Sequence, residues 1–123
     1  MREPNFEFYV LNHDFNRKKV YSFNIFSNAY VYDRTLEAAE EFFDGNITRE
    51  DLTNRIKQSI MYEEWSRCEY EISVGAPFET DTNKLEKWDC FKQALPNLPL
   101  IVDMVITRYF KYRTDKLATY KED

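Results

Sequence analysis

Apolar and polar residues alternate in two short runs near the start of the chain, and this alternation constrains the fold more than any other feature. The apolar faces carry Phe6, Phe8 and Val10 in the first run and Tyr21, Phe23 and Ile25 in the second. A period of two is typical of a half-buried strand. We therefore predict two antiparallel strands, joined by the polar stretch NHDFNRKK at 12–19, which puts His13 in the turn. A third, short strand within 29–32 also fits the pattern.

Two helices are predicted next. The first covers TLEAAEEFF, with Thr35 as its N-cap and Gly45 where a left-handed C-cap is needed. Its apolar stripe consists of Leu36, Ala39 and Phe43. The second helix begins at Thr48, because TRED is a capping-box pattern that pairs Thr48 with Asp51. Steps of four residues then place Leu52, Ile56 and Ile60 on its apolar face, and we expect it to end near Trp65.

The second half of the chain is predicted to hold a strand and a last helix. Glutamate and serine alternate with Tyr70, Ile72 and Val74, which indicates a strand over 69–74 that ends at Gly75 and Pro77. The segment KLEKWDC at 84–90 is compatible with an edge strand or with the start of a helix. The last helix is expected after Asn97 as its cap, with Pro99 in its first turn. Its apolar stripe consists of Ile101, Met104, Val105 and Ile106.

Together these elements predict one α+β domain over residues 1–123, with the order ββααβ(β)α. An antiparallel sheet of three to four strands would carry the helices packed on one face. The longest apolar stretch, LIVDMVI at 100–106, is too short to span a bilayer, so no membrane association is expected.

No catalytic set stands out, and we expect a protein that is not an enzyme and has no cofactor and no metal. The chain has two glycines, too few for a loop that cradles phosphate. His13 is its one histidine, and Cys68 and Cys90 lack the CxxC spacing of a zinc site. A metal-dependent hydrolase or nuclease that uses Glu69 and Glu71 is a third-ranked alternative, because a strand would hold these carboxylates about 7 Å apart.

The same residues have a plainer interpretation. On the wet face of a strand, Glu69 and Glu71 would be solvated glutamates, with Arg67 beside them as an ion-pair partner. They remain secondary candidates for binding, together with Trp88. For Trp65 and Trp88, a place in the core and a place at an interface are both open.

Charge is distributed unevenly. Residues 33–71 carry eleven acidic and five basic side chains, whereas residues 84–121 carry four acidic and eight basic ones. The net charge of −5 disfavours direct binding of nucleic acid, and the acidic half suits a basic protein surface. The densest acidic patch, and hence the candidate binding site, consists of Glu37, Glu40, Glu41 and Asp44.

Several motifs resemble those of small proteins encoded by phages and mobile elements of Gram-positive bacteria, a group that has no settled activity. They are WSRCEYEI at 65–72, NIF at 24–26 and a D-x-F/Y-x-Q pattern at 89–93. The likeness covers most of the chain. It departs at ALPNLPL (94–100), where two prolines interrupt the expected helix. No site residue follows from the resemblance, but it implies a protein that acts in the cytoplasm of a host cell.

Small acidic single-domain proteins from phages often disable a host defence protein by binding it, and anti-CRISPR proteins are similar to this chain in type. The leading hypothesis is a non-enzymatic inhibitor that binds a nucleic-acid-handling host protein, such as a Cas9-type CRISPR effector or its guide-RNA complex. The alternative is a structural or adaptor domain that pairs with itself or with other phage proteins.

Overall fold

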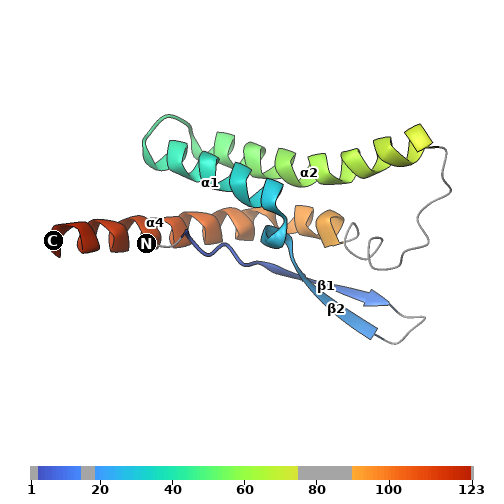
Figure 1. Ribbon diagram of the computed structural model, residues 1–123, viewed down its shortest axis with the longest axis horizontal. Coiled ribbons are helices and arrows are strands. Elements are labelled where there is room, and N and C mark those ends of the chain that lie inside the picture. Colours follow the sequence, from blue (N-terminus) through green and yellow to red (C-terminus); the bar gives the residue numbers. More distant parts are fainter. Residues whose placement is uncertain (1–2, 15–18, 75–89, 123) are drawn as a thin grey trace.

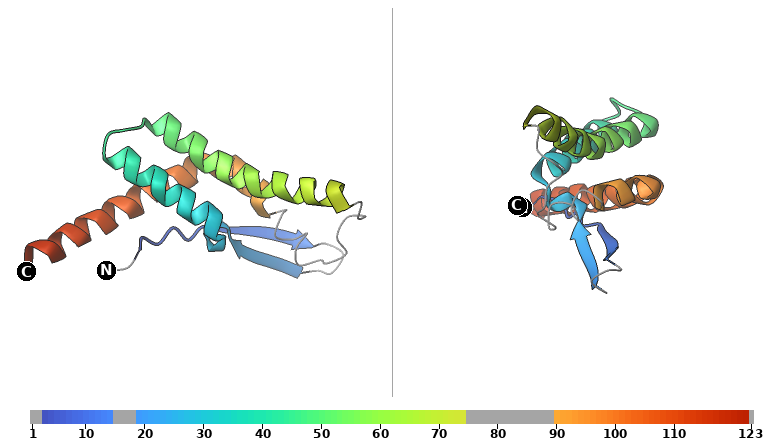
Figure 2. Two further views of the ribbon diagram at one scale, coloured as in Figure 1. Left: turned by 45° about the horizontal axis from the view of Figure 1, so that its top comes forward. Right: turned by 90° about the vertical axis from the view of Figure 1, so that its right-hand side faces the viewer.

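The computed structural model describes residues 3–14, 19–74 and 90–122. A hairpin of β1 (Tyr9–Asp14) and β2 (Lys19–Asn24) leads through a short 3-10 turn, η1 (Ile25–Ser27), into α1 (Ala29–Phe43). Helix α2 (Arg49–Val74) returns antiparallel to α1, and α4 (Leu98–Glu122) follows a second 3-10 turn, η2 (Leu95–Asn97). Figures 1 and 2 show α1 and α2 as a pair, with α4 packed beside it and the hairpin on the α4 side, away from α2.

The prediction of two antiparallel strands is confirmed, but their bounds differ from those expected: both strands extend into the polar stretch, Phe6 and Phe8 precede β1, and Ile25 lies in η1. Val10 lies opposite Phe23, and His13, predicted in the turn, lies in β1 opposite Val20. Asn24 joins the hairpin to η1, because its side-chain oxygen accepts hydrogen bonds from the backbone N–H groups of Phe8 and Phe26 at 3.1 and 3.0 Å. The hairpin is therefore fixed to the helices at its base.

The segment before the hairpin is tied to α4 by polar contacts. Arg108 donates to the carbonyl oxygens of Asn5 and Glu7, each at 3.2 Å. The hydroxyl of Tyr32 donates to the Pro4 carbonyl at 2.7 Å. Burial, reinforced by the charge of Glu3, raises the pKa of Tyr32 to about 12. This segment thus bridges α1 and α4.

The predicted sheet of three to four strands is wrong. In the described residues the sheet has two strands, and the expected strand at 69–74 is the last part of α2, which continues well past Trp65. Two physical reasons account for this. Trp65, Cys68 and Ile72 also satisfy helical spacing, so the short pattern fits both structures. No glycine or proline interrupts 49–74, and a helix propagates until it meets a breaker.

The start of α1 also differs from the prediction. The side chain of Asn28 accepts a hydrogen bond from Val31 N–H at 3.1 Å, and the helix therefore begins at Ala29, where a short strand had been considered. Thr35, the predicted cap, is instead buried inside the helix. The predicted C-cap is confirmed, since Gly45 adopts a φ of 79° just after the helix.

The predicted last helix is confirmed in position. Residues 90–94 are helical, η2 contains Pro96, and Pro99 lies in the first turn of α4. The capping role expected for Asn97 is not seen, because its amide donates to the Gln93 carbonyl at 3.1 Å. The doubtful segment at 84–90 falls outside the described residues except for Cys90, which is helical and buried.

The core lies where the three helices and the hairpin base meet. Its fully buried aliphatic residues include Ile25 before α1, Val31 in α1, Leu52, Ile56 and Ile60 in α2, and Ile101 and Val105 in α4. Phe23 of β2 meets Phe91 edge-on, with ring centroids 5.7 Å apart. An ion pair between Arg49 and Asp103 links the start of α2 to α4.

Thr35 places an unfavourable polar group in this core. Its hydroxyl oxygen is buried and has no hydrogen-bond partner in the described structure. An unpartnered buried hydroxyl costs about 1–3 kcal/mol. Because valine has nearly the same shape, Thr35→Val should raise the free energy of unfolding by about 1 kcal/mol, measured by urea denaturation. Thr53→Val is the control, because the Thr53 hydroxyl donates to the backbone carbonyl of Arg49 at 2.9 Å. This change should not raise the free energy of unfolding. Equal effects of the two changes would contradict this account.

The capping box at the start of α2 should make the stability of the protein depend on pH. Thr48 N–H donates to the Asp51 carboxylate and Asp51 N–H donates to the Thr48 hydroxyl, both at 3.1 Å, as predicted. The hydrogen bond from the Thr48 backbone, followed by the bond with its side chain, lowers the pKa of Asp51. The ionised carboxylate therefore stabilises the fold above the pKa of the unfolded chain, and this contribution is lost as the pH falls through the lower folded-state pKa.

Asp51→Ala should accordingly destabilise the protein near neutral pH, and the difference from the wild type should vanish in acid. Denaturation curves over a range of pH measure this difference. Glu50→Ala removes a neighbouring exposed carboxylate that does not take part in the cap. If both variants show the same pH dependence, the cap is not its source.

Candidate protein-binding face

The outward side of α1 carries a row of carboxylates. Asp33, Glu37, Glu40 and the C-cap residue Asp44 follow one another at spacings of four, three and four residues, so they share one face of the helix. All four are exposed. The opposite side is buried through Val31, Ala38 and Ala39. We call these four acidic residues the α1 ridge.

Three of the four predicted patch residues lie on the ridge, and Glu41 does not. It turns toward α2, where its carboxylate forms an ion pair with Arg55. Asp44 is on the ridge, but Arg113 of α4 donates to it at 2.7 Å. The hydrogen bond with Asp44 is the main reason that the pKa of Arg113 is raised. The structure thus uses two of the predicted carboxylates to join α1 to its neighbouring helices.

Sequence reasoning missed Asp33. The helix was predicted to begin at Thr35, which left Asp33 outside it. Spacing of four residues from Asp33 to Glu37 is visible in the sequence, and recognition of Asn28 as the cap would have included it. Glu37 has a contact within its own helix, because Arg34 lies 3.8 Å from its carboxylate. Such an exposed pair three residues apart contributes little.

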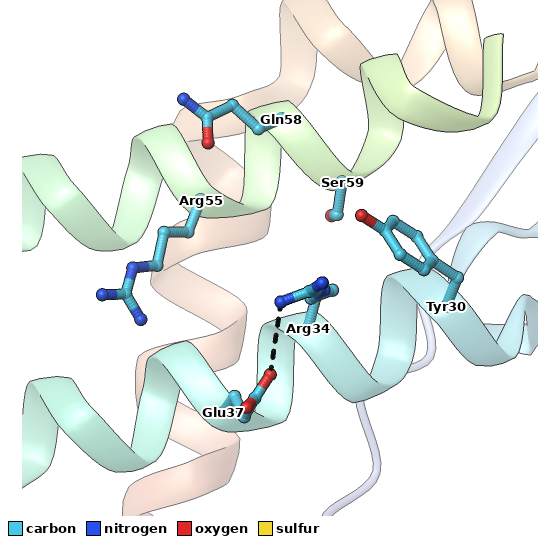
Figure 3. Close-up of a pocket in the computed structure, with 6 residues that line it drawn as sticks. All are labelled: Tyr30, Arg34, Glu37, Arg55, Gln58 and Ser59. Atoms are coloured by element: carbon cyan, nitrogen blue, oxygen red, sulfur yellow. Dashed lines mark ion pairs between the residues drawn. The ribbon is translucent and has the colours of Figure 1, made fainter. Parts of the chain in front are cut away.

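Beside the ridge, a cleft of about 320 Å³ opens between α1 and α2. Figure 3 shows the side chains of Arg34 from α1 and Arg55 from α2 in the space between the helices, with the hydroxyl end of Tyr30 directed toward Ser59. The Ser59 hydroxyl is buried and donates to the Ile56 carbonyl at 2.8 Å. Polar groups thus line this side of the ridge.

One residue that lines this cleft, Tyr30, belongs to an aromatic pair. The rings of Tyr30 and Tyr62 stack with centroids 4.7 Å apart, and the Arg34 guanidinium lies 5.4 Å from the Tyr30 centroid. Met61 and Tyr62 are both exposed. Aromatic residues and arginine are enriched in protein interfaces, so the tyrosine pair and Arg34 are side chains suited to contact with another protein.

The structure does not place the secondary binding candidates, Glu69, Glu71 and Trp88, on this face. The backbone of Glu69 and Glu71 belongs to α2, which removes the strand geometry that would hold their carboxylates side by side, and their side chains lie outside the described part. The side chain of Trp65 also lies outside the described part, and Trp88 falls in the segment 75–89, which is not described. Within the described residues, no three metal-binding side chains gather, and no helix has the length and hydropathy needed to cross a membrane.

Comparison with known proteins returns no match: no family model fits the chain, no curated protein is similar to it in sequence, and no solved structure is similar to it. The resemblance to small phage proteins therefore stays a prediction.

Two neighbouring residues of the ridge, Glu40 and Asp44, should differ in their effect on stability. Asp44 is ion-paired with α4, whereas Glu40 forms no ion pair in the described structure. Asp44→Asn should lower the free energy of unfolding by up to about 1 kcal/mol, as expected for a half-exposed pair. Glu40→Gln should leave it unchanged. Urea denaturation of both variants tests this, and an equal loss in the two would show that the ion pair contributes nothing specific.

Proposed function

We propose that this protein is a non-enzymatic inhibitor of the phage type, which binds a nucleic-acid-handling host defence protein through the α1 ridge. The observation that carries the proposal is the row of exposed carboxylates on one side of a single helix. Asp33 and Glu40 have no ion pair in the described part of the chain, so their charges are available to a basic surface.

The way in which α1 is held supports this role. Ion pairs with Arg55 and Arg113 join the helix to α2 and α4, and its apolar side is buried against the core. The ridge is thus presented on a rigid element. A rigid surface loses little conformational entropy on binding, and a row of like charges accelerates association with a partner of opposite charge.

A Cas9-type effector is the partner to test first, because its nucleic-acid channel is positively charged. An acidic ridge suits such a channel by charge complementarity. The effector with bound guide RNA is a separate candidate, since the RNA covers part of the basic surface. The comparison of the two forms indicates whether the ridge competes with RNA.

The test is a double charge reversal. Glu37→Lys with Glu40→Lys should leave the fold intact, because both residues are exposed, and should slow association with the effector by about tenfold or more at low salt. Rising salt should weaken the wild-type complex in the same direction. Surface binding kinetics with and without guide RNA measure both effects.

The matched control reverses Glu7 and Glu50, two exposed glutamates away from the ridge. It changes the net charge equally and should bind nearly as the wild type does. If both double variants bind equally well, the ridge is not the docking surface. If the wild type binds neither form of the effector and light scattering shows a dimer, the adaptor alternative replaces the inhibitor.

A further inference from the structure

A second cleft opens at the C-terminal end of the ridge, lined by residues of α1, its C-cap and the second half of α4. Its volume is about 410 Å³. Two carboxylates from α1 and its C-cap, Glu40 and Asp44, face two tyrosines of α4, Tyr109 and Tyr112. Leu117, also in the lining, is 55% exposed and adds an open apolar surface.

Cations of the chain itself already occupy part of this cleft. The Arg113 guanidinium donates to Asp44 at 2.7 Å, and the Lys116 ammonium lies 5.8 Å from the centroid of the Tyr112 ring. A carboxylate beside the faces of aromatic rings is a general arrangement for the recognition of cations. The walls therefore have the chemistry of a guanidinium site, and one guanidinium is bound there.

One carboxylate in the cleft, that of Glu40, has no ion pair of its own, although its charge acts on the nearby guanidinium of Arg113. In the described structure no ion pair or side-chain hydrogen bond involves Glu40, although Asp44 beside it is paired. Burial raises the pKa of Tyr109, and the charge of Glu40 is the next cause, so this carboxylate acts on the tyrosine at the floor of the cleft. A cation that pairs with Glu40 would leave the ion pair between Asp44 and Arg113 intact.

We propose that the α1–α4 cleft is a docking site for one arginine side chain of a protein partner, with Glu40 as the acceptor of its guanidinium. Arginine fits better than lysine, because the planar guanidinium can pair with a carboxylate through two N–H groups while it stacks on an aromatic ring. The apolar stem of the side chain would pack on Leu117. This inference rests on the proposed function in that it identifies a residue type on the partner that the ridge meets.

The test uses the full chain and a short capped peptide whose one charged residue is arginine. The same peptide with citrulline in place of arginine is the neutral control. Chemical shifts of the Tyr109, Tyr112 and Leu117 side chains, followed during titration, should change in a saturable way with the arginine peptide and remain constant with the citrulline peptide.

Three variants separate the cleft from general attraction to an acidic surface. Glu40→Gln should weaken peptide binding by about tenfold, which corresponds to the loss of about 1.4 kcal/mol. Glu37→Gln removes the same charge from the same ridge but outside the cleft, and should bind nearly as the wild type does. Lys116→Met removes the competing ammonium and should tighten binding. Circular dichroism checks that each variant folds.

Equal weakening by Glu40→Gln and Glu37→Gln would overturn the proposal, because binding would then depend on the charge of the ridge as a whole. Equal shifts with the two peptides would overturn it as well. Since no effector is needed, this test is independent of the inhibitor test: the peptide result decides the arginine site, and the charge reversal against the effector decides the function.

Discussion

The close packing of α1 against α2 and α4 is the constraint on which the other features depend. Ala38 and Ala39 are fully buried on the inner side of α1, and side chains this small let the neighbouring helices approach closely. The buried aliphatic residues of α2 and α4 then fill the same core. Because one side of α1 is committed to this core, the charged residues on its opposite side are held together in a row.

Polar contacts at the borders of α1 determine what remains of that row. Arg55 and Arg113 each neutralise one carboxylate, Glu41 on the α2 side and Asp44 on the α4 side. Of the other ridge residues, Glu37 has only the exposed contact with Arg34 of its own helix, and Asp33 and Glu40 have no ion pair in the described structure. The ridge is therefore narrower than the acidic composition of the segment implies, and it lies between two clefts that differ in chemistry. One contains two arginines beside a tyrosine pair, and the other contains an unpaired glutamate beside two tyrosines.

This arrangement gives the surface two functions that need not fail together. Long-range attraction depends on the summed charge of the ridge and is screened by salt, whereas recognition of a single side chain depends on the shape and aromatic walls of one cleft. Stiff positioning of α1 serves both, because neither the row of charges nor the cleft has to be assembled when a partner arrives.

Local signals in the sequence predicted much of this fold correctly. The pairing of the first two strands, the capping box of Thr48 and Asp51, the left-handed Gly45 and the apolar stripe of Leu52, Ile56 and Ile60 all depend on patterns within a few residues, and all are found. The first strand, however, begins at Tyr9, after Phe6 and Phe8. Three of the four predicted patch residues also lie together on the exposed side of α1, because helical spacing is a local property as well.

Other features could not be predicted from the local pattern. Residues 69–74 satisfy the period of a strand and that of a helix, and their own pattern does not choose between the two, whereas the structure shows that α2 continues through Val74. Tertiary structure decided the next two features. Two polar residues, Asn28 and Thr35, were both suited to cap α1, and burial placed Thr35 inside the helix. Arg55 and Arg113 reach Glu41 and Asp44 across 14 and 69 residues of sequence. Ion pairs of that kind form only when folding brings distant segments together, which is why the sequence by itself determined where the acidic residues gather and only the folded chain determined which of them stay free.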